Sequence, residues 1–133
     1  MLLRQRVVVY VERDDRLLVF DHRDNPEAGT QVSAGGVRDG EKLLDAAIRE
    51  VRKETGVCLD APPRLLGNHE HLDGLNRPAL SHFFRVNAPD GLARAWQHVV
   101  TGDGEDAQLV FECRFDPAPE LWPVQSVFRP RGL

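Results

Sequence analysis

The feature that most constrains this chain is the stretch GGVRDGEKLLDAAIREVRKETGV, residues 35–57. Leu44, Ile48 and Val51 recur in it at the spacing of one helical face, which predicts an amphipathic helix with this apolar stripe against a core. Gly56 predicts the end of the helix, because glycine adopts the left-handed conformation there at little cost. The glycine pair at the start of the stretch lets the backbone turn tightly before the helix.

Charged residues occupy the other faces of the predicted helix. Gly40 and Glu41 mark its start, and Glu41 suits the positive end of the helix dipole. Glu50 and Glu54 lie four residues apart and therefore share a face, with Lys53 next to both. Carboxylates that converge beside an open backbone carbonyl suit a hard divalent cation such as Mg²⁺. Such a cation can neutralise a diphosphate and polarise the water that attacks it.

The spacing of these residues resembles the Nudix box, G-x5-E-x7-R-E-U-x-E-E-x-G-U, in which U is a bulky aliphatic residue. The residues that match it are Gly35, Glu41, Arg49, Glu50, Val51, Glu54, Gly56 and Val57. The one departure is Lys53, which replaces the first glutamate of the pair. The resemblance implies a Nudix-like α/β/α sandwich with a mixed β-sheet and one main box helix. It also implies a hydrolase that uses Mg²⁺ or Mn²⁺ to cleave a diphosphate linkage in a nucleoside diphosphate derivative.

The same resemblance implies roles for individual residues. The carbonyl of Gly35 and the carboxylates of Glu50 and Glu54 would be metal ligands. Glu50 would also act as general base, held in place by Arg49. Glu41 would contact these ligands without binding the same ion, or it would bind a further metal ion.

Lys53 leaves two functions open. An ammonium about 4 Å from a divalent cation, in an effective dielectric of about 20, repels it by roughly 8 kcal/mol as an upper figure. Lys53 could also pair with Glu50 or Glu54 and occupy the place of the ion. The chain is therefore either a hydrolase that binds metal weakly or uses fewer ions, or a nucleotide-binding or sensor protein with the Nudix fold and little turnover.

Apolar and β-branched runs predict strands on both sides of the helix. We expect them at residues 6–12, 16–22, 30–34, 65–72, 80–88, 96–100 and 109–115. The first two form a hairpin across the turn Asp14-Asp15. A short helix over residues 92–99 is the alternative to the sixth strand. Several strands around one strong helix predict a single α+β domain over residues 1–133.

Further site residues are expected outside the helix. Nudix enzymes often supply one more glutamate from a downstream loop; Glu105 is expected in that role, with Asp106 and Glu70 as alternatives. Arginines in loops suit phosphate binding. The candidates of this kind are Arg23, Arg38 and Arg77.

Aromatic and imidazole side chains offer two other possibilities. Trp96 or Phe83 could stack on a nucleobase. His69 and His71 share one face of a strand, and His82 could lie across from them, but no further ligand has clear spacing for zinc. A zinc site is therefore not favoured.

The formal net charge of −4 argues against binding to a nucleic-acid polymer or an acidic membrane, because both need a basic face. A small nucleotide substrate remains compatible with it, and a homodimer is possible. Cys58 and Cys113 lie in apolar runs and are expected as buried, reduced thiols. The apolar stretch at the N-terminus is too short for a signal peptide, and no run approaches the ~20 apolar residues of a membrane span. We therefore expect a cytoplasmic protein.

Overall fold

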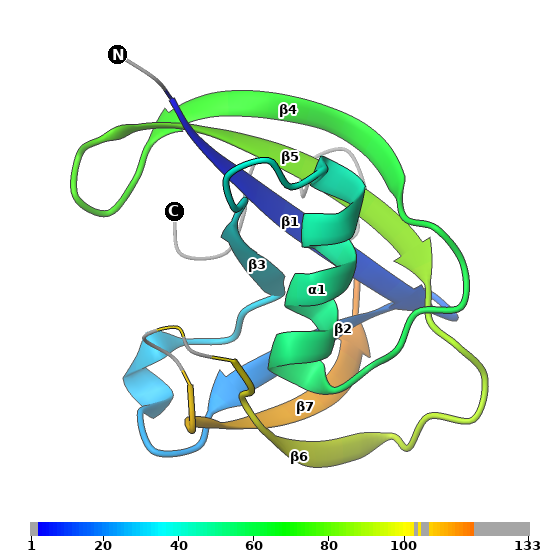
Figure 1. Cartoon of the computed structure of the whole chain (residues 1–133). Helices are drawn as coiled ribbons and strands as arrows, with labels where there is room; N and C mark the ends of the chain where they lie inside the picture. The colour runs from blue at the N-terminus through cyan, green and yellow to red at the C-terminus, as the bar shows by residue number, and fades with distance from the viewer. Residues whose placement is uncertain (1–2, 103, 105–106, 119–133) are drawn as a thin grey trace.

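A computed structural model of the chain describes residues 3–102, 104 and 107–118 (Figure 1). Within these residues the elements are β1 (Arg4–Arg13), β2 (Arg16–His22), η1 (Pro26–Ala28), β3 (Ser33–Gly36), α1 (Leu43–Thr55), β4 (Arg64–Leu72), β5 (Pro78–Asn87), β6 (Ala95–Val99) and β7 (Val110–Pro117). The strands form one sheet in the order β4-β5-β1-β2-β7-β6, and β3 pairs with β1 beside this path.

β1 is the strand around which the sheet is assembled. Along one edge it pairs in parallel with β5 from Arg4 to Glu12. The other edge is divided, because β3 pairs with its first half and β2 with its last residues, both antiparallel. The sheet is therefore mixed. The predicted α+β class, with a mixed sheet and one main helix, is confirmed.

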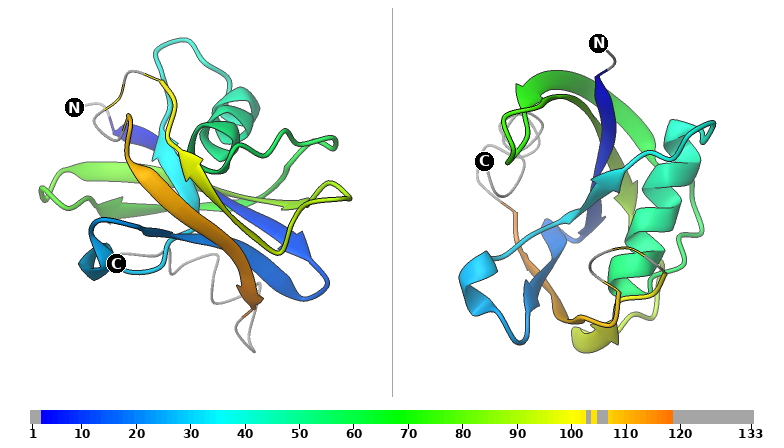
Figure 2. Two further views of the ribbon diagram at one scale, coloured as in Figure 1. Left: turned by 90° about the horizontal axis from the view of Figure 1, so that it is seen from below. Right: turned by 60° about the vertical axis from the view of Figure 1, so that its left-hand side comes forward.

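The valine-rich sequence of β1 supplies both faces of the core. Val7, Val9 and Val11 belong to the cluster that α1 covers, whereas Val8 and Tyr10 belong to a second cluster on the other face. Alternate residues of a strand point to opposite faces, so an unbroken apolar run suits a strand that is buried on both sides. The two views of Figure 2 show α1 lying over one face of the sheet.

The helix α1 ends as predicted and begins later than predicted. Gly56 follows it with a φ of 79°, and its N–H donates to the carbonyl of Arg52 at 2.9 Å. The helix starts at Leu43, after Lys42, and not at Gly40 or Glu41. Gly40 instead has a φ of 74° and forms part of the turn that precedes the helix.

The apolar stripe expected on α1 is partly wrong. Leu44 and Ile48 are 37% and 36% exposed. Val51 is buried as predicted, and Ala46 and Ala47 are buried beside it. The reason is that Glu50, Val51, Glu54 and Thr55 continue the buried face of the alanines. The helix is thus rotated so that small residues and carboxylates, rather than its largest apolar side chains, face the sheet.

Other local predictions are confirmed or corrected. The segment of Trp96 is a strand, β6, and not a short helix. The strand expected at residues 30–34 begins later, at Ser33, and Gln31 makes only an isolated bridge to Phe20. Cys113 is buried, and burial raises the pKa of its thiol to about 12. Cys58 is exposed, contrary to expectation, because it follows the end of α1 in a loop outside the sheet.

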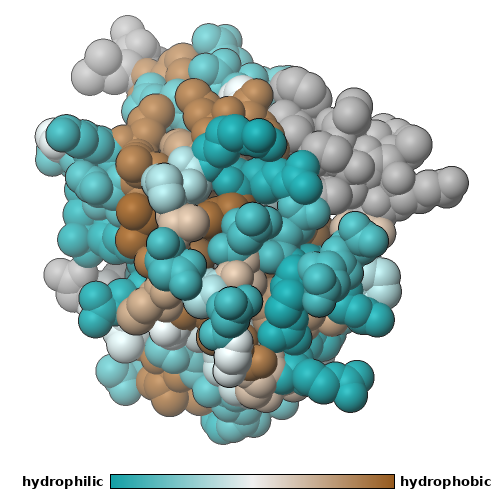
Figure 3. Space-filling model, turned by 90° about the vertical axis from the view of Figure 1, so that its right-hand side faces the viewer, coloured by the Kyte–Doolittle hydropathy of each residue, from teal (hydrophilic) through white to brown (hydrophobic). Residues whose placement is uncertain are grey.

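Large apolar side chains also reach the surface. Among the described residues they are Leu44, Ile48, Leu65, Leu72, Leu75, Val99 and Leu109. On the face shown in Figure 3, hydrophobic residues lie in several separate areas between hydrophilic ones.

The possibility of a homodimer stays a prediction. No helix among the described residues has the length and apolar character needed to cross a membrane.

Gly40 before α1 and Gly56 at its end both have positive φ, and comparing alanine substitutions at the two positions tests this geometry. We expect Gly40→Ala to cost only the left-handed backbone penalty of about 1–2 kcal/mol, since a Cβ there meets nothing within 4 Å. Gly56→Ala should cost more, because its Cβ would lie 2.9 Å from Nδ1 of His98. That ring is fixed by Nε2, which donates to the Lys53 carbonyl at 3.0 Å. Urea unfolding of both variants measures the difference, and equal losses of stability would contradict the account.

Candidate functional site

The guanidinium of Arg49 connects α1 to the loop before it. Its Nε and one terminal nitrogen donate to the two carboxylate oxygens of Glu41, both at 2.8 Å. The same terminal nitrogen donates to the carbonyl of Gly36 at 2.8 Å, and the other donates to Oε1 of Glu50 at 2.7 Å. A planar fork with several donors is suited to such bidentate pairing. Arg49 therefore fixes the position of one helix carboxylate relative to the glycine pair.

Glu41 is held on two sides. Besides the hydrogen bonds from Arg49, its Oε1 accepts the backbone N–H of Arg38 at 3.0 Å. The Arg49 guanidinium is the main cause that lowers the pKa of Glu41 to about 2, and the Arg38 N–H adds to it. Glu41 is thus ionised at neutral pH, and it ties the turn before α1 to the middle of the helix.

The carboxylates of Glu50 and Glu54 both face β3. These side chains are nearly buried, since the residues are 2% and 6% exposed. Oε1 of Glu54 accepts the backbone N–H of Ala34 at 3.0 Å. The carboxylate of Glu50 lies against Gly35 so closely that a Cβ on Gly35 would collide with its carbon and both oxygens. Two acidic groups one helical turn apart therefore meet the backbone of the same short strand.

Lys53 lies beside these carboxylates. Its Nζ is 3.7 Å from Oε1 of Glu50, and its side chain is 19% exposed. Its backbone carbonyl accepts hydrogen bonds from Nε2 of His98 and from the N–H of Thr101. The ammonium is therefore held next to the carboxylate, with little of its side chain in contact with water.

The oxygen atoms at this place have the chemistry that a hard divalent cation requires. The carboxylates of Glu50 and Glu54 meet the backbone at Ala34 and Gly35, and carboxylate and carbonyl oxygens suit Mg²⁺. The absence of a side chain at Gly35 is what lets a carboxylate approach this backbone. Among the described residues, however, no three acidic, histidine or cysteine side chains converge in a way that could hold a metal. Glu50 and Glu54 are the two carboxylates of α1 that meet β3, and Lys53 stands where the full motif has a further glutamate.

Two cavities flank the box. One of about 450 Å³ lies along the outer side of α1, with a largely basic lining of Arg38, Asp45, Ile48, Arg49, Arg52, Lys53, Thr101 and Gly102. The other, of about 560 Å³, lies beside the turn before α1 and includes Gly36, Arg38 and Glu41 in its lining. Arg38 belongs to both. The partly exposed Ile48 and the basic Arg52 were not expected at the site; their spacing of four on one helical face was the available signal.

Three predicted substrate-binding residues line neither of these cavities. Arg23 pairs with Asp24, and Arg77 pairs with Asp73 at the turn between β4 and β5. Trp96 lies against the end of α1, where its indole N–H donates to the carbonyl of Thr55 at 2.8 Å.

The remaining candidates lie elsewhere or outside the described residues. Phe83 is fully buried and stacks on Tyr10, so it is a core residue rather than a platform for a base. Glu70 is on β4, which β5 separates from β1. Glu105 and Asp106 lie outside the residues that the structure describes.

The histidines have local partners. Nε2 of His71 is hydrogen-bonded to the hydroxyl of Ser81 at 2.7 Å, and Nε2 of His82 donates to Oε1 of Gln5 at 2.6 Å. The rings of His69 and His71 are stacked with centroids 6.2 Å apart. Burial lowers the pKa of His82, which favours its neutral form at this position.

This mixed sheet, with one main helix packed against a glycine-bearing strand, has the Nudix class of fold. The NUDIX domain family matches residues 2–126, and the chain belongs to this family.

Individual relatives agree with this assignment. The RNA pyrophosphohydrolase of Cereibacter sphaeroides is 32% identical over 75 residues, and the match covers 45% of this chain and 46% of that protein. The chain thus matches less than half the length of these curated relatives. A MutT NUDIX hydrolase from Burkholderia pseudomallei superposes with a TM-score of 0.65 and 22% identity, over 88% of this chain and 84% of that one. A NUDIX hydrolase from Nitrosomonas europaea gives 0.64 and 20%, over 98% and 82%. At these identities the two structures show the fold alone.

The two neighbouring glycines of β3 allow a matched test of the packing of Glu50. Gly36→Ala should be nearly neutral, because a Cβ there meets nothing within 4 Å. Gly35→Ala should lower the free energy of unfolding by about 1–3 kcal/mol, because the Glu50 carboxylate must leave the hydrogen bond from Arg49. Chemical denaturation of both variants measures the effect. The account fails if the two substitutions cost the same.

Proposed function

We propose that this chain hydrolyses a diphosphate linkage in a small nucleoside diphosphate derivative, with Mg²⁺ or Mn²⁺ as cofactor. Members of the NUDIX family are pyrophosphohydrolases that generally need a divalent metal, which supports the reaction class. The observation that carries the proposal is the convergence of the Glu50 and Glu54 carboxylates on β3, with Arg49 bridging Glu50 and Glu41.

In this proposal the carboxylates of Glu50 and Glu54, with the carbonyl of Gly35, hold the ion. When bound, the ion would neutralise the diphosphate and make its attack by water easier. Glu50 accepts a proton from the attacking water, whose oxygen bonds to one phosphorus while the bridging P–O bond breaks. Arg49 keeps the Glu50 carboxylate in place for that transfer, and Glu41 keeps Arg49 in place.

The basic cavity beside α1 supports a phosphate-bearing substrate. Its lining includes Arg38 and Arg52 next to Lys53, and arginines are well suited to phosphate oxygens. We assign phosphate binding to Arg38 within this proposal. Binding by Arg23, Arg77 and Trp96, and completion of the site by Glu105, stay predictions.

Lys53 is the observation that favours the second candidate, a nucleotide-binding protein with little turnover. Its ammonium stands 3.7 Å from Glu50 and so reduces the negative charge available to a cation. The contacts of Glu50 and Glu54 with β3, and the hydrogen bond from Arg49 to Glu50, support hydrolysis instead. We therefore place hydrolysis first, with weaker metal binding or fewer ions than the full motif.

The test is a panel of substrates with Mn²⁺. Triphosphates are scored for phosphate released from the pyrophosphate product by pyrophosphatase, and ADP-linked compounds for phosphate released from the two monoester products by alkaline phosphatase. The panel contains nucleoside triphosphates, ADP-linked compounds and a 5′-triphosphorylated RNA oligonucleotide. We expect product from at least one small nucleotide, and a loss of about 10–100-fold in activity for Glu54→Gln, which changes a proposed metal ligand. Glu27→Gln, which changes an exposed glutamate of η1, is the control and should keep full activity.

Two outcomes would contradict the hydrolase. Equal rates for the wild type and Glu54→Gln would remove the box from the reaction. A nucleotide that raises the melting temperature of the wild type, without product under any condition, would establish the binding protein instead.

A further inference from the structure

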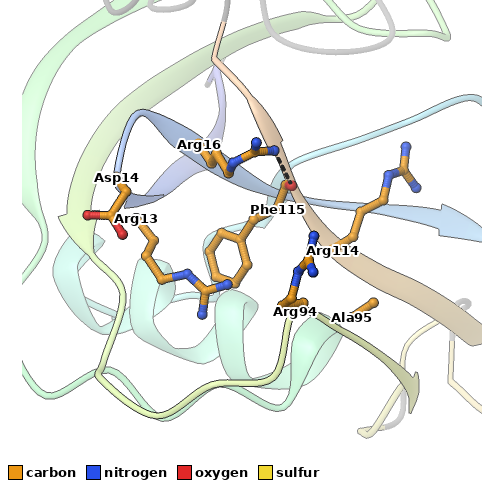
Figure 4. A pocket seen from close by; sticks show the side chains of 7 residues that line it. All are labelled: Arg13, Asp14, Arg16, Arg94, Ala95, Arg114 and Phe115. Carbon is orange, nitrogen blue, oxygen red and sulfur yellow. Dashed lines mark hydrogen bonds between the residues drawn. The ribbon is translucent and has the colours of Figure 1, made fainter.

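A cavity of about 750 Å³ lies at the end of the β1–β2 hairpin, and it shares no lining residue with the two cavities beside the box. Its lining is Arg13, Asp14, Arg16, Arg94, Ala95, Arg114 and Phe115. Figure 4 shows these side chains on three separate parts of the fold: the hairpin, the start of β6 and β7. A space of this size is typical of a site for a small molecule.

The hairpin turn places two of the arginines together. Asp14 and Asp15 both have positive φ, 49° and 63°, which is the conformation of a tight two-residue turn between antiparallel strands. Arg13 and Arg16 are consequently direct cross-strand partners. Like charges at directly opposite positions destabilise a sheet, so this pair has a cost that a bound anion would remove.

Two of the cationic groups are held at the cavity by contacts that do not neutralise them. Arg13 donates to the carbonyl of Leu92 at 3.0 Å, and its guanidinium lies 4.0 Å from the centre of the Phe115 ring. Arg16 donates to the carbonyl of Phe115 at 3.5 Å. Arg94 is exposed, at the residue before β6. These contacts orient two of the side chains and leave their positive charge in place.

The charges around the cavity are not balanced by the protein. Within residues 3–102, 104 and 107–118, no ion pair joins a carboxylate to Arg13, Arg16 or Arg94. Arg114 differs, because it pairs with Asp21 and Asp116 and points away from the other arginines in Figure 4. Three arginines therefore face a cavity whose lining contains one carboxylate, in a chain whose net charge is −4.

We propose that this cavity is an anion site for a molecule that carries a chain of two or more phosphates. Arginine presents a planar fork that pairs with two phosphate oxygens at once, and arginines on separate elements can engage successive phosphates. A single small carboxylate would engage one fork and leave the other guanidinium groups without a counter-charge. The site does not depend on the box, and it binds its ligand without a metal ion.

The test is calorimetric titration of tripolyphosphate and of ADP into the full chain, in metal-free buffer at low salt. We expect saturable binding of at least one of them, weakened tenfold or more in the double variant Arg16→Glu/Arg94→Glu. Equal affinities for the two ligands would assign recognition to the phosphate chain alone, and tighter binding of ADP would add a contact to its nucleoside; both support the site.

Two control variants distinguish this site from other basic surfaces. Arg64→Glu makes the same charge change at an exposed arginine of β4 and should alter affinity by less than twofold. Arg52→Glu changes the basic cavity beside the box and should leave this binding in place. Loss of binding in Arg52→Glu with none in Arg16→Glu/Arg94→Glu would overturn the proposal, as would the absence of saturable binding. Amide chemical shifts report directly on the location, and we expect ligand-induced changes at residues 13–16 and 94–95.

Discussion

The structure of the site depends on one side chain, the guanidinium of Arg49. It reaches two carboxylates and a backbone carbonyl that belong to three consecutive parts of the chain: the strand β3, the turn before α1 and the helix itself. Its own pKa is raised, chiefly by the hydrogen bonds to Glu41, so its charge is permanent. Without this charge, Glu41 and Glu50 would lose a shared partner in a mostly buried place, and losing one partner of a buried pair costs several kcal/mol. Arg49 therefore acts on the geometry of the site and on its electrostatics together.

The strand β3 supplies the backbone that the carboxylates of α1 contact. β3 occupies only the first half of one edge of β1, and it presents Ala34 and Gly35 to the helix. Gly35 on β3 has no side chain, so the carboxylate of Glu50 on α1 can approach the strand closely. Close approach brings the carboxylates of Glu50 and Glu54 to the backbone of β3. Oε1 of Glu50 and Oε1 of Glu54 are thus buried with hydrogen-bond donors beside them, as buried carboxylates require.

Residue spacing alone was sufficient to predict the helix, its end at Gly56 and the hairpin strand Arg16–His22. It was insufficient for the orientation of the helix, because the expected stripe assumed that Leu44 and Ile48 would be buried. Hydrogen bonds and charge pairing, which hydrophobic periodicity does not measure, turn Glu50 and Glu54 inward instead. The exposure of Cys58 was missed for a similar reason, since an apolar neighbourhood in sequence does not determine which side of a loop faces the core.

Contacts between distant segments were beyond prediction from the sequence. Arg16 and Arg94 border one cavity because β2 and β6 both pair with β7, and no local pattern indicates that order of strands. Lys53, in contrast, was identifiable at once as a departure from a known spacing. Its distance from Glu50 depends on how the side chains pack in the folded chain.

The central claim is that Glu50 and Glu54 form a cation cradle whose charge Lys53 partly neutralises. The most direct measurement is Mn²⁺ binding, followed by the electron paramagnetic resonance of the free ion, to the wild type, Lys53→Glu and the control Arg52→Glu. The account predicts that Lys53→Glu binds Mn²⁺ at least tenfold more tightly, which corresponds to about 1.4 kcal/mol, or binds one more ion, and that Arg52→Glu changes affinity much less. Equal affinity and stoichiometry in the wild type and Lys53→Glu would contradict it.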